Sequence, residues 1–280
     1  MQNLADILDE AVAIAREAGD ILREGWGKAN RVVYKGEVNL VTEYDTRAEA
    51  TIITALRRTF PDHAIHAEER GAVGNGDGDE SPYRWLIDPL DGTTNFAHGF
   101  PVFAVSLALM VQPLDGHPRG GPLIGVIYDP TRDECFTAMR GQGAALNGRP
   151  IHASDTPTLN AALLATGFAY DRRARPDNNT GHFDHFIRRC QGMRRAGAAA
   201  LDLAYVACGR LDGFWELRLH PWDVAAGVLL VQEAGGRVSD LNGGPEYLSG
   251  EQIVASNAHI HDEMLAVLRL GDVPLPNLSF

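Results

Sequence analysis

The chain has few cysteines, only three in 280 residues. Cys135, Cys190 and Cys208 are neither an even set nor closely spaced, so the sequence predicts no disulfide framework and no zinc knuckle. A reducing cytoplasm is the expected location of such a protein.

Long hydrophobic runs are also missing. No stretch approaches the roughly 20 apolar residues that a membrane-spanning helix needs, so no membrane partner is expected. The first apolar side chains are spaced along an amphipathic helix and do not form the continuous apolar region of a signal peptide. They are Leu4, Ile7, Leu8, Ala11, Ile14, Ala15 and Ala18.

The chain has no excess of positive charge. Its 25 basic residues stand against 37 acidic ones, and the formal charge of -12 disfavours nucleic acid as a partner. One basic cluster consists of Arg188, Arg189, Arg194 and Arg195. Because of it, a regulatory protein that binds RNA or another protein is an alternative function. An acidic protein can still bind an anionic substrate when its carboxylates hold divalent cations.

The apolar residues, 45% of the chain, are enough for a substantial core. Their spacing predicts helices over residues 3–24, from about 48 to Pro61, 198–209 and 223–234, and strands over 85–87, 103–111, 123–128, 163–166 and 213–217. Asn147-Gly148 predicts a hairpin turn, and the Gly- and Asp-rich residues 71–82 predict an exposed, mobile loop. We expect a layered α/β fold, with residues 1–150 and 151–280 as two halves of one compact unit.

The segment from Asp88 to Thr94 carries the clearest chemical signal. It follows a buried strand that Pro89 should end, and Asp91 can return to the side of Asp88, so that two carboxylates and the Leu90 carbonyl face one point. Oxygen ligands of this kind suit Mg²⁺ or Mn²⁺. Gly92, Thr93 and Thr94 then offer backbone N–H groups to an anion. The alternative for either acid alone is an ordinary Asx turn.

Three further acidic elements strengthen this interpretation. Glu68 and Glu69 are adjacent, so only one of them should point at a shared site if the segment is extended. Asp223 precedes a helix of small residues, and Asp45 precedes the second helix; each is equally well explained as a helix N-cap.

Taken together, these segments resemble the inositol monophosphatase family of magnesium-dependent, lithium-sensitive phosphatases. The resemblance rests on VTEYD at 41–45, AEE at 67–69, DPLDGTTNF at 88–96 and WDVAAG at 222–227, which together span most of the chain. It implies a fold of alternating helix and sheet layers, a homodimer, and hydrolysis of a phosphorylated sugar or polyol, most closely myo-inositol monophosphate. It also implies two or three Mg²⁺ ions per site, with Mn²⁺ as the other candidate.

The resemblance assigns roles to individual residues. Glu69, Asp88 and the Leu90 carbonyl are expected to bind one ion, and Asp88, Asp91 and Asp223 a second. Water activation is assigned to the Glu69 ion, assisted by Thr93 and Asp45. The expected substrate contacts come from both halves of the chain: Asp91, Gly92, Thr93, Thr94, Arg194, Ala199, Glu216 and Asp223. Ala198 departs from the pattern, because several relatives have Ser or Thr there, and this leaves the substrate open.

Other substrates of the same superfamily are therefore alternatives: histidinol phosphate, fructose 1,6-bisphosphate and 3′-phosphoadenosine 5′-phosphate. Asn95 in DGTTNF favours the inositol monophosphatase branch over the nucleotide branch. A glycosidase with paired carboxylates is disfavoured, since Asp88 and Asp91 are close in sequence and no aromatic-rich cleft is indicated.

Overall fold

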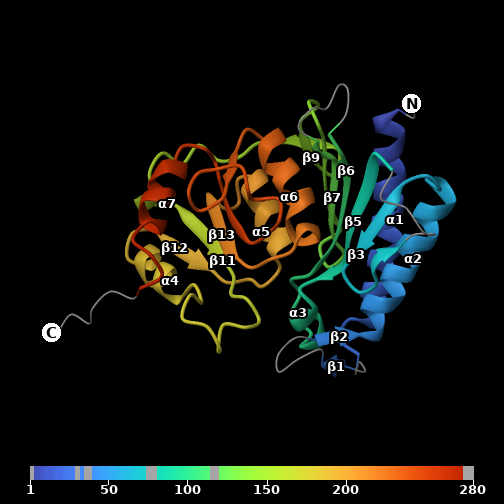
Figure 1. Cartoon of the computed structure of the whole chain (residues 1–280), viewed down its shortest axis with the longest axis horizontal. Helices are drawn as coiled ribbons and strands as arrows, with labels where there is room; N and C mark the ends of the chain where they lie inside the picture. Colours follow the sequence, from blue (N-terminus) through green and yellow to red (C-terminus); the bar gives the residue numbers. More distant parts are fainter. Residues whose placement is uncertain (1–2, 29–31, 35–39, 74–80, 114–119, 274–280) are drawn as a thin grey trace.

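The structure is a computed structural model that describes residues 3–28, 32–34, 40–73, 81–113 and 120–273. Its helices and sheets alternate in layers, as expected (Figure 1). None of the helices in these ranges combines the length and the apolar character that crossing a membrane requires.

The first layer contains α1 (Leu4–Gly25) and α2 (Glu43–Thr59), which cover one face of a large sheet (Figure 1). The apolar residues of α1 recur every three or four positions, and those facing the sheet, Ile7, Ala11, Ile14, Ala18 and Leu22, are buried. Both helices confirm the prediction from periodicity, and α2 ends before Pro61 as expected.

The large sheet has eight strands in the order β10-β9-β8-β7-β6-β5-β3-β4, antiparallel except where β3 meets β5. Its strands are β3 (Ala64–Ala67), β4 (Gly71–Val73), β5 (Tyr83–Asp91), β6 (Ala104–Val111), β7 (Gly121–Asp129), β8 (Glu134–Met139), β9 (Ala144–Leu146) and β10 (Arg149–Ile151). Asn147 and Gly148 both have positive φ in the predicted hairpin turn between β9 and β10.

A second sheet has five strands in the order β12-β11-β13-β15-β14. They are β11 (Leu163–Thr166), β12 (Gly192–Arg194), β13 (Gly213–Leu217), β14 (Arg237–Ser239) and β15 (Gln252–Ser256). The strands predicted over 163–166 and 213–217 are therefore confirmed.

Helices α5 (Ala199–Ala207) and α6 (Pro221–Glu233) lie between the two sheets (Figure 1). Their small residues allow close packing: a Cβ on Gly125 of β7 would lie 2.8 Å from the Ala226 carbonyl oxygen of α6. On the other side of the second sheet are α4 (Thr180–Ile187) and α7 (His261–Leu268) (Figure 1). Shorter elements complete the fold: β1 (Val32–Tyr34), β2 (Leu40–Thr42), α3 (Thr93–Ala97) and the 3₁₀ turn η2 (Leu159–Ala161).

Two local predictions differ from the structure. The 71–82 segment was expected to be a loop, but Gly71–Val73 forms β4 and pairs with β3; residues 74–80 lie outside the described residues. Strand β5 also continues past Pro89 to Asp91, because the pairing with β6 shifts register between Asp88 and Asp91 and the bulge accommodates the missing N–H of proline.

Candidate active site

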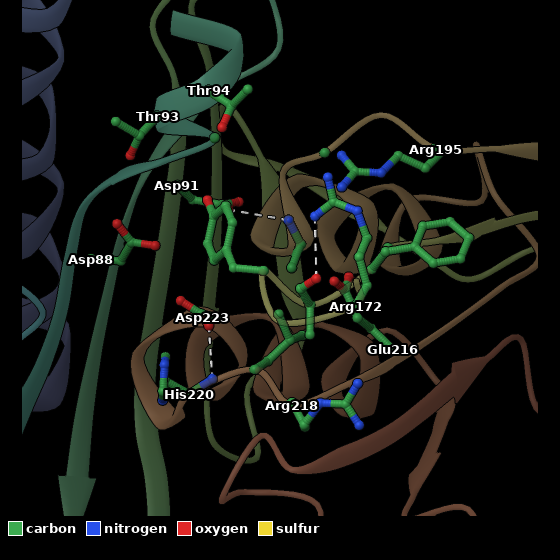
Figure 2. A pocket seen from close by; sticks show the side chains of 18 of the residues that line it. Asp88, Asp91, Thr93, Thr94, Arg172, Arg195, Glu216, Arg218, His220 and Asp223 are labelled. Atoms are coloured by element: carbon green, nitrogen blue, oxygen red, sulfur yellow. Dashed lines mark hydrogen bonds between the residues drawn. The ribbon is translucent and has the colours of Figure 1, made fainter. Parts of the chain in front are cut away.

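A cavity of about 440 Å³ lies where the end of β5 and the start of α3 face loops from the second half of the chain. Figure 2 shows Asp88, Asp91 and Asp223 on one side and Arg172, Arg195, Arg218 and Glu216 on the other. The acids that line it are Glu68, Asp88, Asp91, Glu216 and Asp223, and the basic residues are His98, Arg172, Arg195, Arg218 and His220.

The bulge at the end of β5 places Asp88 and Asp91 on the same cavity. Both side chains are buried. The Leu90 amide donates to Asp88 Oδ1 at 2.9 Å, which is the Asx turn considered as the alternative. The turn and the site thus coexist, since one Asp88 oxygen shapes the turn while the side chain still lines the cavity.

Gly92 turns the chain from β5 into α3. Its φ of 91° is favourable only for glycine, and a Cβ there would lie 2.9 Å from the Val102 carbonyl oxygen. The amides of Thr93 and Thr94 follow in the first turn of α3, where N–H groups have no intrahelical carbonyl partner. Gly92, Thr93 and Thr94 all line the cavity, so these amides are placed to meet an anion.

Asp45 does not line the cavity but contacts a residue that does. It is the third residue of α2, and its Oδ2 accepts from the Thr42 amide at 2.9 Å in a capping box. Its Oδ1 accepts from the Thr93 hydroxyl at 3.1 Å. Burial raises the pKa of Asp45 to about 6, while the hydrogen bonds from Thr42 and Thr93 oppose that rise.

Asp223 occupies the same position in α6 that Asp45 occupies in α2. Its Oδ2 accepts from the His220 amide at 2.7 Å, and Pro221 begins the helix. The sequence suggested an N-cap, but His220 is the N-cap and Asp223 the third residue. In both helices the capping bonds from the N-cap residue go to one carboxylate oxygen, which leaves the other available for the site.

Asp91 interacts with the start of α5. Its carboxylate accepts from the Ala199 amide at 3.2 Å and from the Ala200 amide at 2.8 Å. Ala198 is the N-cap of α5 and offers no side-chain acceptor, so a carboxylate distant in sequence satisfies these amides. Burial raises the pKa of Asp91 to about 6, against the lowering effect of the amides.

Glu216, at the end of β13, enters the cavity from the second sheet. Burial raises its pKa to about 8; the charge of Asp202 raises it further and Arg195 lowers it. A Cβ on Gly167 would lie 2.1 Å from both Glu216 carboxylate oxygens. Glycine at 167 therefore provides the space in which this carboxyl group lies.

The structure separates the two adjacent glutamates. Glu68 lines the cavity, and its charge raises the pKa of both Asp88 and Asp223. Glu69, the residue expected from the sequence to bind metal, is absent from the lining; its charge acts instead on Asp45 and Glu49. The two acids diverge because β3 ends at Ala67 and the chain turns at 68–70, so their directions depend on the turn.

A similar one-residue difference occurs at the arginines. Arg194, expected to contact substrate, is exposed and donates to the Met193 carbonyl at 3.0 Å, whereas Arg195 lines the cavity. Sequence reasoning also missed Arg172 and Arg218, although the basic run 172–175 was a visible signal. Arg218 is held by Asp171 at 3.1 Å and by Asp177 at 3.1 Å.

The acids of the cavity are suited to cations. Burial, and then the charges of Glu68, Asp91 and Asp223, raise the pKa of Asp88. Among the residues described, no three Asp, Glu, His or Cys side chains already form a metal cage. Mg²⁺ does not need one, since it usually keeps several waters and binds one or two carboxylates together with substrate phosphate. The all-oxygen donor set and its crowded negative charge therefore fit a divalent cation.

The sequence and the fold of the chain match known proteins over nearly their whole length. The model of the inositol monophosphatase family matches residues 3–270. An inositol-1-monophosphatase of Synechocystis is 47% identical over 96% of this chain and 89% of its own, and the Nus factor SuhB of Pseudomonas aeruginosa is 46% identical over 94% and 96%. The solved inositol monophosphatase of Anabaena has a TM-score of 0.83 at 46% identity, covering 96% of this chain and 97% of its own.

Proposed function

Because the chain belongs to the inositol monophosphatase family and is a phosphatase that hydrolyses phosphate monoesters, we propose that it acts on myo-inositol monophosphate with Mg²⁺. One observation carries the proposal. Glu68, Asp88, Asp91 and Asp223 share a single cavity with the Gly92-Thr93-Thr94 turn. Carboxylates for cations thus lie beside amides for phosphate, which is the combination that metal-assisted hydrolysis of a phosphate ester uses.

The family is generally metal-dependent, and we propose that the acids of this cavity hold two ions. Glu68 and Asp88 would hold one, with the Leu90 carbonyl, which accepts from the Thr93 hydroxyl and is not part of the lining, as the expected third ligand. Asp88, Asp91 and Asp223 would hold the other. Bound divalent cations supply Lewis acidity and neutralise the charge on the phosphoryl oxygens. Titration of the metal-free protein with Mg²⁺ and with Mn²⁺ would show whether a third ion binds and which of the two ions binds more tightly.

Thr93 and Asp45 are placed to orient an attacking water. The Thr93 hydroxyl lies 3.1 Å from Asp45 Oδ1 and 3.0 Å from the Leu90 carbonyl oxygen, so its hydrogen points at one of these acceptors. A lone pair of Thr93 Oγ1 then remains to accept a hydrogen from water in the cavity. A proton can pass through Oγ1 to Asp45, whose pKa of about 6 allows it to take up and release a proton near neutral pH.

Glu216 is proposed to recognise the polyol. Since burial raises its pKa to about 8, the carboxyl group is mostly protonated at neutral pH and can both donate to and accept from substrate hydroxyls. Arg195, on the same side of the cavity, supplies a charge near this group. The Asp91 contact with α5 supports the position of Ala199 in the same wall.

The test is a panel of phosphate esters assayed with Mg²⁺: inositol 1-phosphate, histidinol phosphate, fructose 1,6-bisphosphate and 3′-phosphoadenosine 5′-phosphate. We expect the highest kcat/KM for inositol 1-phosphate. The Asp88→Asn variant is the control for the site, and it should fold but lose turnover by at least about 10²-fold, since it removes the charge shared between the two cation positions. A higher kcat/KM for another ester would reassign the substrate. Parental turnover by Asp88→Asn would show that this cavity is not the active site.

Cytoplasmic location and a homodimer are also part of the proposal. Cys135, Cys190 and Cys208 are all free thiols, which suits a reducing compartment. Analytical ultracentrifugation at micromolar concentration measures the oligomeric state, and a monomer would exclude the dimer.

A regulatory role is the second candidate, because relatives at 46% and 43% identity are named Nus factor SuhB. The basic cluster of the sequence does not act as a unit in the structure. Arg188 pairs with Asp184 at 3.0 Å, Arg189 donates to the His185 carbonyl, and Arg195 lines the cavity. Salt-sensitive RNA binding that the double variant Arg188→Ala, Arg189→Ala abolishes would support this role; binding that is unchanged would oppose it.

A further inference from the structure

Glu49 is a buried carboxylate without a part in the proposed chemistry. It lies on α2 one turn after Asp45, and its side chain is 0% exposed. Its Oε2 accepts a hydrogen bond from the backbone amide of Glu69 at 2.8 Å. Thus one helix contacts two parts of the site: Asp45 binds the Thr93 hydroxyl, and Glu49 binds the turn that carries Glu68.

That turn is held from two sides. The Glu68 amide donates to the Ile87 carbonyl of β5 at 3.1 Å, one residue before Asp88. The next amide, that of Glu69, donates to Glu49. Because peptide groups are planar, the first bond fixes the peptide before Glu68 and the second fixes the peptide after it. Both backbone torsions of Glu68 are therefore restrained, and with them the direction of its Cα–Cβ bond.

The other contact of Glu49 is weaker. Arg70 Nε lies 3.3 Å from Glu49 Oε1, and the Arg70 side chain is 48% exposed. Oε1 itself is buried, and the backbone amide of Arg70 also acts on the Glu49 carboxylate, less strongly than that of Glu69. An ion pair with a partner this exposed contributes little, so the amide bond from Glu69 is the main interaction of this carboxylate.

We propose that Glu49 is a positioning residue: by holding the Glu69 amide, it directs the Glu68 carboxylate toward Asp88 and so sets the affinity of the site for a divalent cation. This inference rests on the proposed function, in which Glu68 and Asp88 are cation ligands. Partners that orient a ligand in this way typically change metal affinity by about 10- to 100-fold when they are lost.

The test compares three substitutions of Glu49 by calorimetric titration of the metal-free full chain with Mn²⁺. Glu49→Gln keeps the length and an acceptor oxygen, and should stay within about threefold of the parent affinity. Glu49→Asp keeps the charge but withdraws the oxygen by about 1.5 Å, the length of one carbon–carbon bond. Glu49→Leu removes the acceptor. The last two should weaken Mn²⁺ binding by about 10- to 100-fold.

Arg70→Ala is the matched control, because it removes the ion pair and leaves the amide bond; it should bind Mn²⁺ like the parent. Thermal unfolding of each metal-free variant checks the fold. If Glu49→Leu fails to fold, the comparison of Glu49→Gln with Glu49→Asp still tests the positioning role. Parent affinity in Glu49→Asp, or loss in Glu49→Gln alone, would overturn the positioning role. A parent protein that binds no Mn²⁺ would overturn the proposed function as well, so the two failures are distinguishable.

Discussion

The Thr93 hydroxyl donates to Asp45 Oδ1 at 3.1 Å, joining the Gly92-Thr93-Thr94 turn at the start of α3 to the start of α2 across 48 residues of sequence. Asp45 is 1% exposed and Thr93 is 6% exposed. Thr93 lines the cavity, and Asp45, which does not, is linked to the cavity through this hydroxyl.

Replacing Thr93 with Val keeps its shape but removes this hydroxyl. We expect kcat to fall by roughly 10²- to 10⁴-fold, the usual effect of losing a proton-transfer group, with little change in KM. Thr93→Ser should restore most of the rate, because it returns the hydroxyl. Steady-state kinetics on the preferred phosphate ester measure both. A valine variant with the parental kcat would show that water activation does not need Thr93.

The two adjacent glutamates form a matched pair for mutation. Glu68→Gln should weaken Mn²⁺ binding by more than about 100-fold, since even outer-sphere partners change metal affinity by about 10- to 100-fold. Glu69→Gln should have a much smaller effect, because Glu69 does not line the cavity. Calorimetric titration of both variants compares the two. The reverse order of effects would return the ligand role to Glu69.

Gly167→Ala tests the polyol contact without altering Glu216 itself. The new Cβ would overlap both Glu216 carboxylate oxygens, so the carboxyl group must move while the backbone can stay in place. We expect discrimination among sugar phosphates, measured as ratios of kcat/KM, to change by about 10-fold. Mn²⁺ affinity should remain parental, and Glu216→Ala should produce the same pattern. An unchanged substrate profile in both variants would exclude Glu216 from specificity.

The metal-free protein should lose stability as the pH rises. The pKa of Glu216 rises from 4.5 to about 8 on folding. Between these values the folded state keeps a proton that the unfolded state releases. The contribution of Glu216 to the free energy of unfolding is therefore complete below pH 4.5, falls as the pH rises, and is lost once the pH has risen through 8. One such group gives a slope of at most about 1.4 kcal/mol per pH unit.

Urea unfolding from pH 5 to 8 in the presence of a chelator measures this slope. Glu216→Gln should lower this slope by at most about 1.4 kcal/mol per pH unit, because Asp45 and Asp91 also have raised pKa values and keep their own contributions. Glu17→Gln, a change on the exposed surface of α1, should leave the slope unchanged. Equal slopes in the parent and in Glu216→Gln would show that Glu216 does not cause the pH dependence.

The sequence by itself determined several of the elements and predicted acids that line the cavity. Apolar spacing gave α1, β11, β13 and the hairpin at Asn147-Gly148, because periodicity and turn preferences act over a few residues. The same local reasoning identified Asp88, Asp91 and Asp223, whose places depend on a strand end and a helix start. It failed at Pro89, where pairing with β6 let the strand continue through a bulge.

Only the tertiary structure decided which neighbour faces the cavity. Glu68 and Arg195 line it, while Glu69 and Arg194 do not, because consecutive residues at a strand end or turn point in different directions. The anchors that choose between them are distant in sequence: Glu49 holds the Glu69 amide from 20 residues away. Likewise, Asp91 meets the α5 amides across more than 100 residues, a contact that local patterns do not encode.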